Sequence, residues 1–270
     1  MDARLQLRVQ RYGWDRAAPS YELAWKHALA PATAAVLNAA RLRPGERVLD
    51  VACGSGLLTR AAWCAVAAQG GEVVGTDISE LMLAEAAERS PGCRFVRADA
   101  QQLDECVAVG HFDAVLCGLG LMYMPDPEAA LATMARCLRP GGRMAVSVWG
   151  ERRTCGWAEI FPIVDSRVRS EVCPMFFRVG TGTALEDALR AAGLVDVQVS
   201  HPPTTIQYID ADAACDAAFL SGPVALAYSR FDESTRLSVR AEYVASIEPW
   251  RDGERFAIPG TFVIGSGHSP

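Results

Sequence analysis

The sequence predicts an α/β fold built on a doubly wound, mostly parallel sheet. Between residues 43 and 150, five short apolar runs alternate with stretches of helical character, and turn residues separate one from the next. This alternation is typical of buried parallel strands joined by crossover helices. Half of the 270 residues are hydrophobic, which is enough to bury a substantial core in one domain.

The five predicted strands are Arg47 to Ala52, Glu72 to Asp77, Arg94 to Arg97, His111 to Cys117 and Arg143 to Trp149. The predicted helices between them run from Leu57 to about Ala68, from Glu80 to Arg89 with Ser79 as the cap, and from Pro127 to Leu138. Two turns, Arg43-Pro44-Gly45 and Arg139-Pro140-Gly141-Gly142, each lead into a strand.

The two ends of the chain have weaker patterns. The first forty residues are helical in character, and Pro31 is expected to separate a helix that contains Tyr21 to Trp25 from a second one at Ala32 to Ala40. Beyond residue 150, helices are predicted at Trp157 to Arg169, Thr183 to Ala192, Ala211 to Leu220 and Ser234 to Ile247, and strands at Val195 to Ser200, Thr205 to Tyr208 and Arg255 to Gly265. We interpret this region as the end of the same sheet with helical insertions.

Composition excludes several classes of function. The net charge of −6 and a pI near 5.3 argue against nucleic acid as a partner. The sequence predicts no signal peptide and no membrane span, so we expect a cytoplasmic protein. The nine cysteines are scattered without a Cys-x-x-Cys pair, and no metal site is expected.

Acidic and glycine residues follow the first three predicted strands. Asp50 and the Gly54-x-Gly56 turn end the first strand, Asp77 ends the second, and Asp99 follows the third. Ligands of open parallel sheets bind beyond the carboxyl ends of the strands, where glycines allow close approach and an acidic residue can accept hydrogen bonds from ribose hydroxyls. This pattern predicts a site for an adenosine-containing ligand.

The same residues resemble the cofactor motifs of class I S-adenosylmethionine-dependent methyltransferases. Val48-Leu49-Asp50-Val51-Ala52-Cys53-Gly54-Ser55-Gly56 is similar to motif I, and Asp77 and Asp99-Ala100-Gln101 are similar to the next two motifs. Leu138 to Arg143 resembles the turn before the fifth strand. The resemblance is to the branch of ubiquinone and menaquinone methyltransferases and natural-product tailoring enzymes, and it covers residues 40 to 150 well.

This resemblance implies a Rossmann-like, seven-stranded sheet within a single domain. Residues 1–42 would form an N-terminal helical lid, 43–150 the cofactor-binding core, and 151–270 the substrate-side insertions and the end of the sheet. The cofactor would be S-adenosyl-L-methionine, with S-adenosyl-L-homocysteine as product, and the substrate a small molecule. A homodimer is left open.

The resemblance also implies roles for individual residues. Gly54 and Gly56 would line the methionine part of the cofactor, with Asp50 organising their loop and Ala52 within it. Further cofactor contacts are expected from Asp77 to the ribose, Ile78 to the adenine ring, Asp99 and Ala100 to the adenine, Gly118 to the methionyl group, and Tyr21 and Trp25 from the N-terminal helices.

Two other functions are compatible with parts of the pattern. A nicotinamide-dependent oxidoreductase would share the glycine turn, but Thr59 occupies the position where its fingerprint has a third Gly or Ala. A non-catalytic cofactor-binding module would keep the loop and lose the acceptor pocket.

The acceptor side gives only weak candidates. Tyr123, Trp149 and Arg153 follow the strands that face the methyl group, and His201 ends the sixth strand, where it could act as a base. Core packing or exposure to solvent explains each of these residues as well. No fixed catalytic set is predicted, because the cofactor itself carries the activated methyl group.

Overall fold

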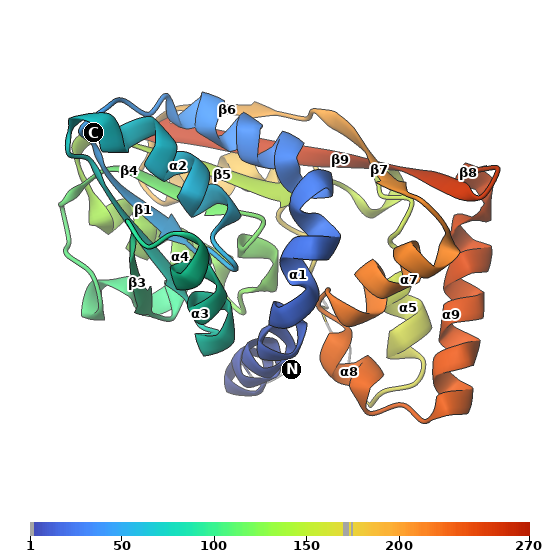
Figure 1. Ribbon diagram of the computed structural model, residues 1–270. Helices are drawn as coiled ribbons and strands as arrows, with labels where there is room; N and C mark the ends of the chain where they lie inside the picture. The colour runs from blue at the N-terminus through green and yellow to red at the C-terminus, as the bar shows by residue number, and fades with distance from the viewer. Residues whose placement is uncertain (1–2, 170–172, 174) are drawn as a thin grey trace.

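The computed structural model describes residues 3–169, 173 and 175–270, and its centre is one twisted sheet (Figure 1). Nine strands take part, in the order β3-β2-β1-β4-β5-β9-β6, with β7 and β8 paired to β9. The strands are β1 (Arg47–Val51), β2 (Glu72–Asp77), β3 (Arg94–Arg97), β4 (Phe112–Gly118), β5 (Leu138–Trp149), β6 (Val195–Ser200), β7 (Pro203–Tyr208), β8 (Arg251–Asp252) and β9 (Arg255–His268).

The sheet is mostly parallel. Strands β1 to β5 pair in parallel, whereas β9 runs antiparallel to β5, β6, β7 and β8. The predicted α/β class is confirmed, and the predicted seven strands correspond to the main path of the sheet. Strand β7, predicted at Thr205 to Tyr208, and the short β8, which was not predicted, pair with the first half of β9, which is 14 residues long and extends well beyond β5.

The α-helices are α1 (Ala3–Ala40), α2 (Leu57–Val66), α3 (Glu80–Arg89), α4 (Pro127–Cys137), α5 (Ile160–Asp165), α6 (Ala184–Ala191), α7 (Ala211–Leu220), α8 (Ala225–Ser229) and α9 (Glu233–Ile247). The connections β1-α2-β2-α3-β3 progress toward one edge of the sheet and β4-α4-β5 toward the other. Because such crossovers are right-handed, α2 and α3 cover one face and α4 covers the opposite face. Figure 1 shows α5, α7, α8 and α9 gathered beneath the far end of β9.

The prediction that Pro31 breaks the N-terminal region was wrong. Helix α1 is continuous over 38 residues and contains both Pro19 and Pro31. A proline removes one backbone hydrogen bond and costs about 3 kcal/mol in a helix interior. Here α1 contacts α2, α3, α7, α8 and the strands β4, β5 and β9, so tertiary packing supports the helix on both sides of each proline.

Other boundaries also differ from the prediction. Strand β5 begins at Leu138, so it includes the predicted turn; Gly141 still has a φ of 70°, and the pairing register shifts between Phe112 and Ala114 of β4. The helix predicted at 157–169 is α-helical only over Ile160–Asp165, and the short helix α8 was not predicted. These short elements depend on contacts with other helices, which periodicity does not reveal.

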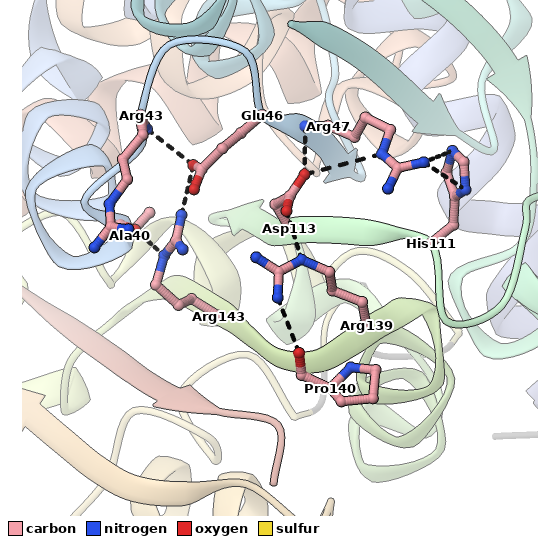
Figure 2. A network of polar contacts seen from close by, with 9 residues as sticks. All are labelled: Ala40, Arg43, Glu46, Arg47, His111, Asp113, Arg139, Pro140 and Arg143. Atoms are coloured by element: carbon pink, nitrogen blue, oxygen red, sulfur yellow. Dashed lines mark hydrogen bonds and ion pairs between the residues drawn. The ribbon is translucent and has the colours of Figure 1, made fainter.

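Figure 2 shows a polar network around the amino ends of β1 and β4 and the first residues of β5. The Arg143 guanidinium bonds the Glu46 carboxylate at 2.6 Å and the Ala40 carbonyl at 2.7 Å, and the Arg43 N–H donates to the same carboxylate at 2.8 Å. The side chains of Arg143 and Glu46 are only 11% and 10% exposed. This pair therefore joins the end of α1 and the start of β1 to β5.

Asp113 forms the second half of this network. Its carboxylate accepts hydrogen bonds from the Arg47 N–H at 2.8 Å and the Arg139 guanidinium at 2.6 Å. Partial burial opposes the charge, but these hydrogen bonds and the two cations outweigh it and lower the pKa of Asp113 below its ordinary value. Asp113 thus has a structural role at the start of β4, where it joins β4 to β1 and β5.

Replacing Arg143 by Met is expected to lower the free energy of unfolding by about 3 kcal/mol, because it leaves the Glu46 carboxylate buried without its cation. Urea denaturation followed by circular dichroism measures this change. The matched control is Arg152→Met, which removes the exposed pair with Glu159 and should cost less than about 1 kcal/mol. Equal effects of the two substitutions would contradict the structural role of the buried pair.

Candidate active site

A cavity opens at the carboxyl ends of the central strands, where the strand order reverses between β1 and β4. It encloses about 1070 Å³ of unfilled space, its open mouth included. Nine residues predicted as cofactor contacts line it: Tyr21, Asp50, Ala52, Gly54, Asp77, Ile78, Asp99, Ala100 and Gly118. We call it the strand-end cavity.

The loop after β1 has an unusual backbone conformation. Ala52 (φ 55°), Gly54 (φ 55°) and Gly56 (φ 85°) all have positive φ angles. Gly56 does not line the cavity; a Cβ there would lie 3.1 Å from the Cβ of Ala86, so this glycine lets α2 begin close against α3. A left-handed alanine is uncommon and costs free energy, and such strain concentrates at ligand sites.

Asp50 is a fully buried carboxylate in the floor of this cavity. The Thr59 hydroxyl donates to its Oδ2 at 2.6 Å, while its Oδ1 has no hydrogen-bond partner among the described residues. Burial, opposed by the Thr59 hydrogen bond and assisted by the nearby charge of Asp77, raises the pKa of Asp50 to about 7. Thr59 stands where a dinucleotide fingerprint has Gly or Ala, and its hydroxyl fixes the orientation of the Asp50 carboxylate.

Asp77 connects the end of β2 to the glycine loop. Its Oδ2 accepts from the Gly54 N–H and its Oδ1 from the Ser79 N–H, both at 2.9 Å. Burial raises the pKa of Asp77 above its ordinary value, and the two N–H groups partly offset that effect. The carboxylate lines the cavity and keeps lone pairs for a ligand hydroxyl.

Asp99 and Ala100 form the third side. Asp99 follows β3, caps a 3₁₀ turn and accepts from the Gln101 N–H at 2.9 Å. The Ala100 carbonyl accepts from the Thr133 hydroxyl at 2.5 Å, which ties this turn to α4. The three predicted carboxylates thus come together at one edge of the sheet.

Helix α1 closes over the loop. Glu22 accepts from the Ser55 hydroxyl at 3.2 Å and pairs with Arg60 at 3.0 Å. Asp15 accepts from the Ser79 hydroxyl at 2.6 Å, which adds a contact from α1 to the N-terminus of α3. Tyr21 lies between these two points, with its ring within 3.9 Å of the position of a Cβ on Gly54.

A second cavity, of roughly 600 Å³, adjoins the first. The two share Trp14, Tyr21, Leu29, Leu119 and Tyr123 as lining residues. Trp25, predicted as a cofactor contact, lines only this second cavity, and so does Trp149. We call it the aromatic cavity, because its other walls include Trp157, Phe161, Phe176 and Tyr243.

Two candidates on the acceptor side lie elsewhere. The Arg153 side chain is 81% exposed and pairs with Glu151. His201 follows β6 on the exposed surface. Neither lines the strand-end or the aromatic cavity, so neither is placed to act on a substrate held there.

Sequence reasoning missed several lining residues. Trp14 of α1 and Leu119 after β4 line both cavities, and Leu119 has a positive φ of 58°. Trp157, Phe161 and Phe176 come from the irregular region after β5. An aromatic-rich segment at 157–177 was the one available signal, although core packing explains such segments equally well.

The strand-end cavity fits an adenosine-containing ligand with a charged amino-acid end. Asp50 offers an unpartnered acceptor, Asp77 a carboxylate at the end of β2, and Gly54 an open backbone. A Cβ on Gly118 would lie 3.1 Å from Leu58, so side-chain bulk there would crowd the same space. The fold and these residues define a Rossmann-like protein of the class I methyltransferase type.

Comparisons with known proteins agree with this class. Residues 49–146 match a family described as a methyltransferase domain. The chain is 30% identical over 256 residues to a nocamycin O-methyltransferase from Saccharothrix syringae, covering 87% of this chain and 89% of that protein. It is 37% identical over 155 residues to a demethylmenaquinone methyltransferase from Beutenbergia cavernae, covering 57% and 61%.

A solved structure has the same fold. Phosphoethanolamine N-methyltransferase 2 from Haemonchus contortus, in complex with S-adenosyl-L-methionine, superposes with a TM-score of 0.60 at 17% identity, covering 95% of this chain and 57% of that chain. The chain belongs to the class I S-adenosylmethionine-dependent methyltransferases that act on small molecules. It is an enzyme, and its cofactor is S-adenosyl-L-methionine.

The stability of the ligand-free protein is expected to depend on pH through Asp50. A folded-state pKa of about 7, above the unfolded value of 3.8, means that the folded state holds the proton more tightly. This group's contribution to stability is therefore present below pH 4 and is lost as the pH rises to about 7. Relative to wild type, Asp50→Asn should gain about 3 kcal/mol between pH 4.5 and pH 8, measured by urea denaturation. Parallel pH profiles for the two proteins would contradict this.

Proposed function

We propose that the strand-end cavity holds S-adenosyl-L-methionine and that the aromatic cavity holds the methyl acceptor. The observation that carries the proposal is the shared wall: five residues, with Tyr123 and Leu119 after β4 among them, line both cavities. Methyl transfer requires donor and acceptor atoms about 3 Å apart and in line. Two adjoining cavities, closed on one side by α1, support such an arrangement.

Each residue of the strand-end cavity would contact a different part of the cofactor. Asp50 Oδ1 would accept from the ammonium group, the Gly54 backbone would border the methionine chain, and Asp77 would accept from the ribose hydroxyls. Asp99, Ala100 and Ile78 would surround the adenine, and Gly118 would leave room beside the methionyl group. Tyr21 would close the cavity from α1. Gly56 would shape the backbone of the loop that borders the cofactor. Trp25 would line the acceptor site in the aromatic cavity.

When bound, the cofactor would supply an electrophilic methyl group: a nucleophilic atom of the acceptor would bond to the methyl carbon in line as the carbon–sulfur bond breaks, with S-adenosyl-L-homocysteine as the leaving group. The lining residues of the aromatic cavity that the structure describes include no His, Asp, Glu or Lys. Burial raises the pKa of Tyr123 well above its ordinary value, so its phenol stays protonated. We therefore propose that the acceptor atom is nucleophilic by itself or loses its proton without a protein base.

The nature of the acceptor rests on the relatives and on the cavity. One relative is named as an O-methyltransferase of nocamycin and another as a methyltransferase of demethylmenaquinone. These names support transfer to a small organic molecule, and the first supports oxygen as the accepting atom. We propose further that 1–42 acts as the lid, 43–150 as the cofactor-binding core and 151–270 as the substrate side of one domain.

Two features stay predictions of the sequence alone, namely a cytoplasmic location and a homodimer. No described helix is long and apolar enough to cross a membrane. No observation favours the nicotinamide-dependent oxidoreductase or the non-catalytic module.

The first experiment is calorimetric titration of the protein with S-adenosyl-L-methionine, S-adenosyl-L-homocysteine and NAD. We expect micromolar binding of the first two and none of NAD. Asp77→Ala should weaken both by at least about tenfold, because a charge-assisted hydrogen bond contributes about 1.5 to 3 kcal/mol.

The control variant is Asp104→Asn, which removes an exposed ion pair with Arg136 outside both cavities and should bind as the wild type does. Binding of NAD alone, or equal affinities in the Asp77→Ala and Asp104→Asn proteins, would refute the assignment of the cofactor to this cavity.

A further inference from the structure

One buried hydrogen bond joins the central strand of the sheet to the first turn of α2. The Thr59 hydroxyl donates to Asp50 Oδ2 at 2.6 Å, and both residues are fully buried. Asp50 lies on β1, which has β2 on one side and β4 on the other. Among the described residues, this hydroxyl is the only side-chain donor to the carboxylate. The orientation of the Asp50 carboxylate therefore depends on Thr59.

The strand-end cavity offers Asp50 no counterion. The lining residues that the structure describes include three aspartates and no Lys, Arg or His. The titratable groups that act on Asp50 or share its cavity come from the loop after β1, α1, β2, β4 and the segment before β3: Cys53, Tyr21, Asp77, Cys117 and Cys93. Burial raises the pKa of the tyrosine and of the three thiols, so these four groups are neutral near pH 7. The charge that acts on Asp50 is thus that of another carboxylate.

The protonation of Asp50 depends on a balance in which Thr59 takes part. A hydrogen bond from a hydroxyl favours the charged form of a carboxylate, whereas burial and a like charge favour the neutral form. Burial raises the pKa of Asp50 to about 7, and the Thr59 hydroxyl is the largest of the effects that oppose it. Without that hydroxyl, Asp50 would be mostly protonated near pH 7. A protonated carboxyl group attracts a ligand cation far less than an ionised one does.

We propose that Thr59 is a positioning residue for the cofactor: its hydroxyl keeps Asp50 oriented and favours its ionised form, so that the ammonium group of the cofactor binds with loss of a proton from Asp50 to the buffer. This inference rests on the proposed function, in which the strand-end cavity holds the cofactor. Thr59 itself does not line the cavity. It acts through Asp50 and touches neither the cofactor nor the acceptor.

The first test uses the unaltered protein. Calorimetric titration with S-adenosyl-L-homocysteine at pH 6.5, in two buffers that differ in ionisation enthalpy, counts the protons released per ligand bound. Because the pKa of Asp50 is about 7, most of the free protein carries this proton at pH 6.5. We expect the release of more than about half a proton for each ligand bound.

The second test removes the hydroxyl and keeps the shape of the side chain. In Thr59→Val, loss of one hydrogen bond to a charged group should raise the pKa of Asp50 by about one unit. The affinity for S-adenosyl-L-homocysteine, relative to wild type, should then fall about tenfold at pH 6 and by less than about twofold at pH 8.5, where Asp50 is mostly ionised in both proteins. Thr59→Ser keeps the hydroxyl and should restore wild-type affinity at both pH values. The ligand's own ionisation is common to all the proteins and cancels in these ratios.

The matched control is Thr133→Val, which removes another buried hydroxyl, the donor to the Ala100 carbonyl at 2.5 Å. Any loss of affinity in this variant comes from a displaced cavity wall, so it should be equal at pH 6 and pH 8.5 within about twofold. A merely structural effect of Thr59→Val would be independent of pH in the same way. The dependence on pH therefore separates a positioning role from a structural one.

Failure of the two proposals is distinguishable. If S-adenosyl-L-homocysteine binds at neither pH, the proposed function fails. If it binds to wild type without releasing a proton, the coupling to Asp50 is refuted. If a proton is released but Thr59→Val loses affinity equally at both pH values or not at all, or Thr59→Ser behaves as Thr59→Val does, the role of Thr59 is refuted.

Discussion

The active site depends on the hydrogen bonds between Asp77 and the loop after β1. One carboxylate receives the N–H of Gly54 on one oxygen and that of Ser79 on the other, so the end of β2 fixes both the loop and the start of α3. Asp15 of α1 bonds the side chain of Ser79, which extends the same network to the helix that covers the cavity. The position of α1, the path of the loop and the start of α3 are thus connected through one buried acid.

That arrangement is costly for the protein without a ligand. Asp50 and Asp77 are both buried, the charge of Asp77 raises the pKa of Asp50, and Asp50 Oδ1 lacks a donor. Buried carboxylates without cations oppose folding. At the amino ends of the same strands, Glu46 and Asp113 have arginines beside them. The carboxylates at the amino ends of the strands therefore have arginine counterions, whereas Asp50 and Asp77 at the carboxyl ends have none among the described residues. This difference is expected when one end of the sheet stabilises the fold and the other binds a ligand.

The residues at the strand ends could be predicted because a parallel sheet places residues that are distant in the sequence next to one another. Asp50, Asp77 and Asp99 lie far apart in the chain, but parallel strands bring their carboxyl ends to one edge, and nine of the eleven predicted contacts line one cavity there. The two exceptions have local reasons. Gly56 packs closely against Ala86 of α3, and Trp25 lines the neighbouring aromatic cavity. The continuity of α1 through Pro31 could not be predicted, since it depends on packing partners scattered from α2 to β9.

The sequence was less informative about the aromatic cavity: Tyr123 and Trp149 line it, whereas Arg153 and His201 do not. A cofactor common to a whole family requires the same polar groups at the same strand ends, whereas the wall of an apolar cavity requires only shape, which many combinations of large side chains can provide. Trp149, Trp157 and Phe176 look like core residues in the sequence because, by burial, they are core residues. That these side chains line a cavity is a property of their three-dimensional surroundings that no local pattern encodes.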